Sequence, residues 1–326
     1  MKNDQRIYGT AEEDCSKGSL FVNARCVVMI PCHNEEVTIE KVILDARSVL
    51  PGAEICVFDN NSTDRTAQLA ERAGAEIIRE KRQGKGFVVQ TMFSRIDADV
   101  YVMVDGDDTY DLRRLPEMVA AIEHDQADMI VGSRLGTSTD MAFRPLHSFG
   151  NRLVAWLINR FFGGNLTDIM SGFRVMSRDF VKSITITATG FEVETELTIK
   201  ALKLHAVIDE AAVCYRPRPH GSFSKLRTFR DGILVIRTIF MICKDYKPFP
   251  FFSAIALCLL VLSVASGSVV VSEFLETRYI SHVPLAILAS GLMILSMIFF
   301  ITGIILDCTN RRFDELYNFV RLKGLK

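Results

Sequence analysis

The stretch Val100-Tyr101-Val102-Met103-Val104-Asp105-Gly106-Asp107-Asp108-Thr109-Tyr110-Asp111 joins an apolar run to four carboxylates within seven positions. The apolar half is typical of a buried parallel strand, and the acidic half of the loop at its carboxyl end, where open α/β sheets bind ligands. Carboxylates this close repel one another unless a cation lies among them. Asp105 and Asp107, separated by Gly106, therefore predict a site for Mg²⁺ or Mn²⁺, which would take its other ligands from water and substrate phosphates. A solvated acidic turn that caps the helix near Arg113 is the alternative, and an isolated pair of this kind favours it.

Short apolar segments alternate with helical ones along the first part of the chain. Strands are expected at residues 26–30, 55–58, 76–78, 100–104 and 129–131, and helices at 35–50, 62–73, 84–96 and 112–123. Ser62 or Thr63 would cap the second helix, and Gly74 would end it. Repeated βα units of this kind predict an α/β fold with a mostly parallel sheet and helices on both faces.

The composition narrows the class of protein. The 326 residues carry a formal net charge of only -1, which argues against a nucleic-acid partner because such proteins need a basic surface. The eight cysteines are scattered and show no zinc spacing. Several of them, namely Cys26, Cys32, Cys56 and Cys258, lie in apolar runs, where a buried free thiol is expected, and a reducing compartment is favoured. The first two dozen residues are polar and do not resemble a secretory signal.

Two uncharged segments near the C-terminus predict a membrane anchor. Residues 251–272 and 283–306 are each long enough to cross about 30 Å of hydrocarbon. Lysines and arginines flank the pair on its outer sides, whereas the linker at 273–282 carries only Arg278. Because positive residues stay inside, both chain ends and the α/β domain are expected to be cytoplasmic. A buried helical hairpin in a soluble protein is the alternative, which these lengths disfavour.

Two amphipathic segments, residues 149–162 and 229–246, mix bulky apolar side chains with arginine and lysine. Both suit helices at a membrane surface, although either one taken alone is also compatible with a core helix. The expected organisation is a polar tail at 1–25, a cytoplasmic catalytic domain at 26–228, a membrane-interface segment at 229–250, a two-helix anchor at 251–306 and a basic cytoplasmic tail at 307–326.

Four further stretches support the metal-site interpretation. They are Ile30-Pro31-Cys32-His33-Asn34-Glu35-Glu36, Asp59-Asn60-Asn61-Ser62-Thr63-Asp64, Ser171-Gly172-Phe173-Arg174 and Gly221-Ser222-Phe223-Ser224-Lys225-Leu226. The first two, with Asp105-Gly106-Asp107, resemble motifs of family 2 glycosyltransferases. The last two resemble those of polyprenyl-phosphate glycosyltransferases, the group that includes dolichol-phosphate mannose synthases and bacterial undecaprenyl-phosphate sugar transferases.

The resemblance runs from Cys26 to Leu226, extends to the two-span tail found in part of the group, and implies a nucleotide-sugar-binding GT-A-like fold. Each motif is weak alone, but five in the expected order are specific. The chain departs from the pattern at Asn60, where many relatives carry aspartate. It also departs after Asp107, where dolichol-phosphate mannose synthases usually show a leucine and a glutamine. The identity of the donor therefore stays open.

The donor site follows from the chemistry of a nucleotide-sugar. A metal at Asp105 and Asp107 would neutralise charge on the departing diphosphate, with Thr109 as a weaker third ligand and Gly106 allowing close approach. The side chains expected near the base and ribose follow the first two strands, where they could instead start or cap a helix. These side chains are Pro31, Asn34, Glu35, Asp59 and Asn60.

The acceptor site is predicted from the chemistry of a lipid monophosphate, which is largely dianionic at neutral pH and needs no strong general base. Arg134, Arg144 and Arg174 suit bidentate phosphate binding, and Arg134, directly after the fifth strand, is also expected to act in catalysis. A loop expected to close over the donor diphosphate carries His220, Ser222, Ser224 and Lys225, although a polar linker is the alternative. Glu194 could meet sugar hydroxyls or simply pair with a helix dipole.

The predicted function is metal-dependent, inverting transfer of one sugar from a UDP- or GDP-linked donor to polyprenyl phosphate at the cytoplasmic membrane face. The acceptor could be dolichyl or undecaprenyl phosphate. A processive polysaccharide synthase is the main rival, but the Gln-x-x-Arg-Trp motif usual in such enzymes is absent, and the single tryptophan is Trp156. A non-catalytic membrane scaffold is the other rival. The sequence leaves open the sugar and the oligomeric state, a homo-oligomer included.

Overall fold

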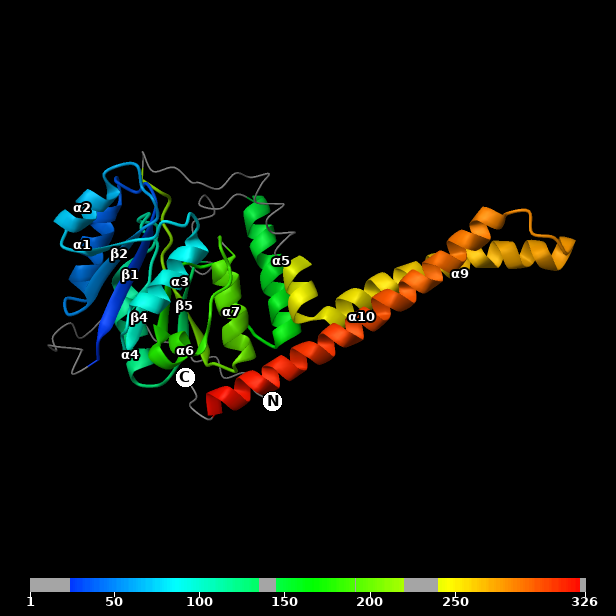
Figure 1. Cartoon of the computed structure of the whole chain (residues 1–326). Helices are drawn as coiled ribbons and strands as arrows, with labels where there is room; N and C mark the ends of the chain where they lie inside the picture. The colour runs from blue at the N-terminus through cyan, green and yellow to red at the C-terminus, as the bar shows by residue number, and fades with distance from the viewer. Residues whose placement is uncertain (1–23, 135–144, 191, 220–239, 323–326) are drawn as a thin grey trace. The chain divides into compact units, whose positions relative to one another are not determined.

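The computed structural model describes residues 24–134, 145–190, 192–219 and 240–322, shown in colour in Figure 1. Seven strands among these residues form one sheet in the order β3-β2-β1-β4-β6-β5-β7. β6 is antiparallel to β4 and β5, and every other pairing is parallel. The strands are β1 Cys26–Cys32, β2 Glu54–Asp59, β3 Glu76–Arg79, β4 Val100–Met103, β5 Met129–Ser133, β6 Arg174–Ser177 and β7 Ile208–Ala212.

All five predicted strands are present, and the predicted mostly parallel sheet is confirmed. β6 and β7 are additions that the sequence did not indicate. β6 has four residues and begins with a buried arginine, while β7 contains two acidic residues and is only partly buried. Both lack the continuous apolar run by which β1 and β4 are recognised.

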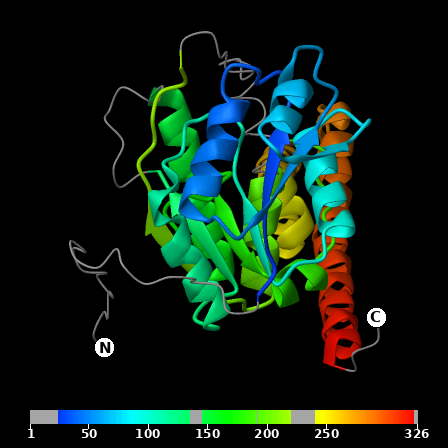
Figure 2. The ribbon, with the colours of Figure 1, turned by 90° about the vertical axis from the view of Figure 1, so that its left-hand side faces the viewer.

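Helices cover both faces of the sheet (Figures 1 and 2). The predicted cap of α2 is wrong: the helix begins after Arg65, and it is the Asp64 carboxylate that accepts the N–H of Thr66, at 2.9 Å. The helices of this part are α1 Ile39–Val49, α2 Thr66–Arg72, α3 Lys85–Arg95, α4 Leu115–Glu123, α6 Arg178–Ser183 and α7 Val193–Lys203, with a 3-10 turn η1 at Leu112–Arg114.

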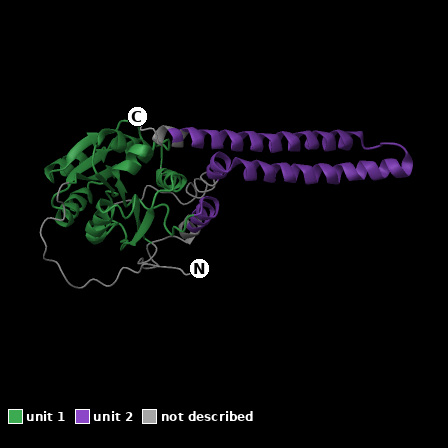
Figure 3. Ribbon diagram, turned by 90° about the horizontal axis from the view of Figure 1, so that it is seen from below, with its two compact units in different colours: residues 1–144, 164–225 green, residues 145–163, 226–326 purple. Residues whose placement is uncertain are grey.

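The chain divides into two compact units (Figure 3). The first contains residues 1–144 and 164–225, and therefore the whole described sheet. The second contains residues 145–163 and 226–326. Helix α5, Pro145–Phe162, thus belongs with the C-terminal helices although the sheet resumes after it in sequence.

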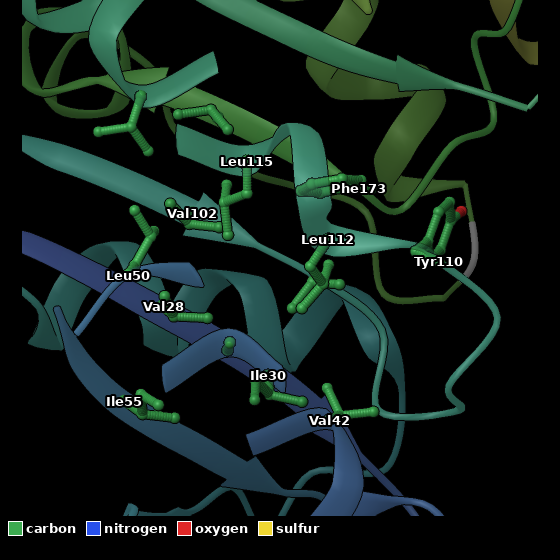
Figure 4. Packing of buried hydrophobic residues seen from close by; sticks show 14 of the residues in the cluster. Val28, Ile30, Val42, Leu50, Ile55, Val102, Tyr110, Leu112, Leu115 and Phe173 are labelled. Atoms are coloured by element: carbon green, nitrogen blue, oxygen red, sulfur yellow. The ribbon is translucent and has the colours of Figure 1, made fainter. Parts of the chain in front are cut away.

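Two apolar clusters, one on each face, hold the sheet to its helices because side chains alternate along each strand. On one face Val28 and Ile30 of β1 pack with α1 and α4, in the cluster of Figure 4. On the other face Val27 and Met29 pack with α3 and α7. Each of these four side chains is fully buried, which contributes about 1.5–3 kcal/mol per residue to stability. The strand ends are thereby held rigidly.

In the second unit, α9 (Pro248–Thr277) and α10 (Val283–Leu322) form a long antiparallel hairpin. Both are long and apolar enough to cross a membrane, and most of their apolar side chains are exposed. Two buried serines join them: Ser263 donates to the carbonyl of Ala289 at 2.7 Å, and Ser296 to that of Ala256 at 2.8 Å. α10 continues without a break to Leu322, so most of the predicted basic tail is helical.

The first predicted amphipathic segment is confirmed as helix α5, and Trp156 on it is 60% exposed. Of the second segment, residues 240–246 are helical, and residues 229–239 lie outside the described part. Phe162 and Tyr246 bring the two segments together through an edge-to-face ring contact at 5.8 Å. Their placement at a membrane surface stays a prediction.

Candidate active site

The site lies at the carboxyl ends of β2, β1 and β4, which are neighbours in the sheet. Cys32 pairs in register with Asp59, and the Asn60 N–H donates to the Cys32 carbonyl at 2.9 Å. On the other side of β1, the Val104 N–H donates to the Met29 carbonyl at 3.2 Å. The three loops that carry the predicted donor and metal residues therefore leave one edge of the sheet together.

The first two sequence motifs interlock. The Asn34 N–H donates to the Ser62 hydroxyl at 3.0 Å, and the Asn34 side-chain oxygen accepts the Thr63 N–H at 2.8 Å. Asn34 has φ 53°, a left-handed conformation that asparagine tolerates better than most residues. Beside it the Glu35 N–H donates to the Thr66 hydroxyl at 2.8 Å. The two loops thus form one surface, on which Asn34 is exposed and Glu35 buried.

Asn60 uses its amide to hold the loop before α3. Its Nδ2 donates to the carbonyls of Glu80 and Arg82 at 3.1 and 2.7 Å, and its Oδ1 accepts the Gly84 N–H at 2.8 Å. An aspartate could not supply the two donors. This gives a physical reason for the departure from the pattern at this position. Asp59, also buried, accepts the Ser62 N–H at 3.1 Å. Donor contact by either residue stays a prediction.

Two glycines shape the acidic loop at residues 104–111, which carries the predicted metal site. A Cβ on Gly106 would lie 2.5 Å from the Cys32 sulfur, so only glycine lets this loop close on β1. A Cβ on Gly172 would lie 2.2 Å from Oδ2 of Asp105. Close approach of backbone to the Asp105 carboxylate therefore explains the glycine of the Ser171-Gly172-Phe173-Arg174 motif. Thr38 at the start of α1 fixes the same loop by donating to the Gly106 carbonyl at 2.7 Å.

Tyr110 connects the acidic loop at residues 104–111 to Gly172. Its buried hydroxyl accepts the Gly172 N–H at 3.0 Å, and its ring makes edge-to-face contacts with Phe173 at 5.6 Å and Tyr215 at 5.4 Å. Burial raises the pKa of Tyr110 well above its ordinary value, so the hydroxyl stays protonated. Tyr110 therefore acts as a neutral hydrogen-bond acceptor that holds the Gly172 backbone in place.

Asp105 faces a buried ammonium group. Lys85, at the start of α3, places Nζ 2.6 Å from Asp105 and 2.5 Å from Glu194, whose side chain is also buried. Burial alone would lower the pKa of Lys85, but these two carboxylates hold it above its ordinary value. Lys85 is thus a permanent positive charge beside the first aspartate, and Glu194 is its partner from α7.

Asp107 is more enclosed than Asp105. Thr109 donates its hydroxyl to one carboxylate oxygen at 2.6 Å, and Arg218 contacts the other at 2.6 Å. Burial, and then the charge of Asp105, raise the pKa of Asp107, while Arg218 and Thr109 oppose the rise. Arg218 also places Nη1 3.3 Å from Oε1 of Glu35. It therefore joins the motif at residues 30–36 to the acidic loop at residues 104–111.

The donor set fits a hard divalent ion. Among the described residues no group of three or more His, Cys, Asp or Glu side chains is placed to hold a metal. The predicted site offers two carboxylates, those of Asp105 and Asp107. Mg²⁺ commonly takes one or two carboxylates and completes its shell with water and substrate phosphates. Thr109, predicted as a third ligand, is buried and hydrogen-bonded to Asp107, so its evident role is to orient that carboxylate.

Arg134 is bound to a carboxylate that the sequence did not single out. Its Nε and Nη2 donate to the two oxygens of Asp168 at 2.7 and 2.8 Å, and its backbone N–H donates to Asp168 at 3.1 Å. Burial disfavours the charge on Arg134, but the side chains around it, Tyr110 and Asp168 first, hold its pKa above the ordinary value. Glu210 of β7 in turn accepts the Asp168 N–H at 2.9 Å. The two residues therefore form a bidentate ion pair.

The acceptor-phosphate role predicted for Arg174 does not fit the structure. Its side chain is fully buried, and its donors reach the carbonyls of Ser171 at 3.0 Å, Ile169 at 2.6 Å and Glu194 at 2.9 Å. Burial lowers its pKa to about 10. Arg174 is better explained as a structural tether that fixes both the Gly172 turn and the start of α7 around Asp105.

The remaining predicted site residues lie outside the described part of the chain. They are Arg144, His220, Ser222, Ser224 and Lys225. Pro31 is at the end of β1, in register with Phe58. Sequence reasoning missed three charged residues of the site: Lys85, Arg218 and Asp168. Lys85 follows a glycine that opens a helix, and Arg218 lies three residues before the Gly221 loop, so position relative to known motifs is the signal that could have found them.

Comparison with known proteins identifies the family. A sequence model described as "Glycosyl transferase family 2" matches residues 27–185. The dolichyl-phosphate hexose transferase of Haloferax volcanii is 30% identical over 221 residues, which cover 68% of this chain and 94% of the relative. The chain belongs to glycosyl transferase family 2. Protein RfbJ of Shigella flexneri is 52% identical to this family 2 member over 128 residues, 39% of this chain and 99% of RfbJ.

A solved structure extends the likeness to the fold. Glucosyl-3-phosphoglycerate synthase from Mycobacterium tuberculosis, in complex with Mn²⁺, uridine-diphosphate and phosphoglyceric acid, superimposes with a TM-score of 0.53 at 23% identity. The match covers 68% of this family 2 chain and 78% of the synthase. At this identity the likeness concerns the fold, and it confirms the GT-A-like architecture expected from the motifs.

Proposed function

We propose that this glycosyltransferase moves one sugar from a nucleotide-sugar to the phosphate of a polyprenyl lipid at the cytoplasmic face of a membrane, with inversion at the sugar. The observation that carries the proposal is the combination in one chain of the Asp105/Asp107 pair and two helices long enough to cross a membrane. The similarity to a dolichyl-phosphate hexose transferase supports a lipid phosphate as acceptor. The Mn²⁺ and uridine-diphosphate bound by the fold neighbour support a metal and a nucleoside diphosphate.

In this proposal Asp105 and Asp107 would hold Mg²⁺ or Mn²⁺, which neutralises charge on the departing diphosphate. The protein does the rest by positioning. Thr109 orients Asp107. The two joined loops that carry Asn34 and Asp59 border the nucleoside. The lipid phosphate is already dianionic, so the site has to hold it in line with the sugar and need not remove a proton.

The acceptor phosphate is proposed to bind beside Arg134, together with Arg144. Arginine suits this task because its planar group can grip two phosphate oxygens. In the structure Asp168 already binds two donors of Arg134, so it sets the plane of the guanidinium. A phosphate that took both of those donors would have to displace Asp168.

We propose that the domain and both termini are cytoplasmic, with the loop between α9 and α10 on the far side.

The test is transfer of label in membranes that contain the full chain. Membranes are incubated with radiolabelled UDP- and GDP-sugars and Mn²⁺, and the lipid is extracted. The expected product is one sugar on one lipid, released by mild acid, with no chain growth as donor is raised. Polymer formation would favour a processive synthase, and the absence of labelled lipid with every donor would refute the proposal.

Metal dependence provides the second test. Chelator should abolish transfer, and Asp107→Asn should lower kcat by about 100-fold or more, since charge stabilisation is lost in the transition state. Asp108→Asn is the matched control. Asp108 is the adjacent carboxylate, pairs with Lys41, and has φ 56°, which asparagine tolerates. Full activity in excess chelator would contradict the metal site.

A further inference from the structure

Each of the two aspartates faces a positively charged side chain of the protein itself. Lys85 contacts Asp105, and Arg218 contacts Asp107. Lys85 is held between two carboxylates with a side chain only 11% exposed, whereas the Arg218 side chain is 27% exposed. Arg218 follows β7 on a segment outside the regular elements, while Lys85 belongs to helix α3. Of the two cations, Arg218 is therefore the one with freedom to leave.

Arg218 occupies the place where a metal would act on Asp107. Its Nη2 lies 2.6 Å from Oδ2, and the Thr109 hydroxyl lies 2.6 Å from Oδ1. A divalent ion bound to Asp107 would therefore stand within a few ångströms of the guanidinium, where like charges repel. Arg218 also contacts Glu35, with Nη1 3.3 Å from Oε1.

A nucleoside diphosphate changes this balance. Its oxygens offer a guanidinium the planar pair of acceptors that arginine binds best. We propose that Arg218 is an exchangeable counter-ion, which neutralises Asp107 in the nucleotide-free enzyme and transfers to the donor diphosphate when the metal binds Asp107. This inference rests on the proposed function and deepens it: metal and nucleotide must then bind with positive coupling, because each makes room for the other.

The same segment supplies a matched control. Arg216, two residues earlier, pairs with Asp111 at 2.9 Å, and its side chain is 49% exposed. Removing Arg216 deletes the same charge from the same segment without touching Asp107. An effect of charge alone would therefore be shared by Arg216 and Arg218 variants, whereas exchange at Asp107 is specific to Arg218.

The experiment measures metal affinity directly. Mn²⁺ binding to the purified full chain is followed by electron paramagnetic resonance, first alone and then with UDP or GDP. In the wild type we expect one nucleotide to tighten Mn²⁺ binding by about tenfold or more, a common size for coupling between sites. Arg218→Ala and Arg218→Gln should bind Mn²⁺ alone about fivefold more tightly and show a correspondingly smaller coupling, because only the part due to direct ligation of the metal by the diphosphate remains. Arg216→Ala should match the wild type.

Each other outcome has a distinct meaning. Unchanged or weaker binding of Mn²⁺ alone by both Arg218 variants, with melting temperatures like the wild type, would overturn the exchange. Equal tightening by Arg216→Ala would overturn it too, because a general charge effect would then suffice. If neither UDP nor GDP binds the wild type with Mn²⁺, the proposed function fails, while the comparison with Mn²⁺ alone still decides whether Arg218 masks Asp107.

Discussion

Replacing Arg174 by methionine tests whether this arginine supports the site or binds substrate. Methionine fills a similar space but donates no hydrogen bond. In the protein the guanidinium serves three backbone carbonyls, at Ser171, Ile169 and Glu194, from a fully buried position. The variant would remove the guanidinium donors from these three carbonyls.

The size of the effect follows from two opposing terms. An unsatisfied buried carbonyl costs about 1–3 kcal/mol, and two are affected, at Ser171 and Ile169, because the Glu194 carbonyl still accepts the Thr198 hydroxyl at 3.0 Å. Removing a buried charge returns part of this, because its desolvation is no longer required. We expect a net loss of about 3 kcal/mol in the free energy of unfolding, or about 6–12 °C in melting temperature for a domain of this size. Arg174→Lys should be similarly destabilising, because an ammonium cannot span the three carbonyls.

The assay is thermal unfolding of the full chain, combined with the KM for polyprenyl phosphate. Arg178→Met is the matched control, since Arg178 lies four residues later, is about half exposed and pairs with Asp97. Its effect should be within about 0.5 kcal/mol. A normal melting temperature for Arg174→Met, with a selective rise in KM for the lipid, would refute the structural role and restore the phosphate-binding one.

Three further predictions concern the loop before α3 and the topology. Asn60→Asp should loosen that loop and raise the KM for the nucleotide-sugar several-fold, because two carbonyls lose their donors; an unchanged KM would contradict this. Hydrogen bonds from Arg82 outweigh the effect of burial and lower the pKa of Glu80 to about 2. The ionised Glu80 carboxylate therefore stabilises the fold above its ordinary pKa, and this stabilisation is lost as the pH falls through about 4.5 toward 2. Glu80→Gln should flatten the acid side of a stability profile in that window, and a parallel profile would count against it. Thr277→Cys in a chain without its native cysteines should react with an impermeant thiol reagent from outside the cell, whereas labelling of the C-terminus from outside would reverse the assigned topology.

The sheet and its site edge were accessible to sequence reasoning because they depend on local signals. An apolar run followed by Asp105 and Asp107 indicates both a buried strand and the loop at its carboxyl end. The two long apolar helices α9 and α10 were equally predictable, because length and absence of charge indicate them. β6 was not recognisable from the sequence, because its place between β4 and β5 depends on long-range antiparallel pairing. A strand of four residues gives no local signal of such pairing.

The arginines show where local reasoning stops. Arg134 and Arg174 each follow a glycine-containing motif, and in both cases bidentate phosphate binding is a reasonable expectation from residue type. The partner of Arg134, Asp168, is remote in sequence. Arg174 donates to the nearby carbonyls of Ser171 and Ile169 and to the distant carbonyl of Glu194. The spacing of a motif does not show whether its arginine turns back onto buried carbonyls or faces a ligand. Burial decides between them, and burial is a property of the assembled fold.

The same argument assigns different parts to the charges around the two aspartates. A group that must stay fixed is best buried, as Lys85 is between Asp105 and Glu194 with a side chain only 11% exposed. A group that must change partners is best kept at the rim, where water can take over its hydrogen bonds during the exchange. Arg218 satisfies this condition, because it contacts Asp107 and Glu35 but remains 27% exposed. In the proposed exchange, Lys85 keeps Asp105 oriented, and Arg218 couples binding of the diphosphate to metal binding at Asp107.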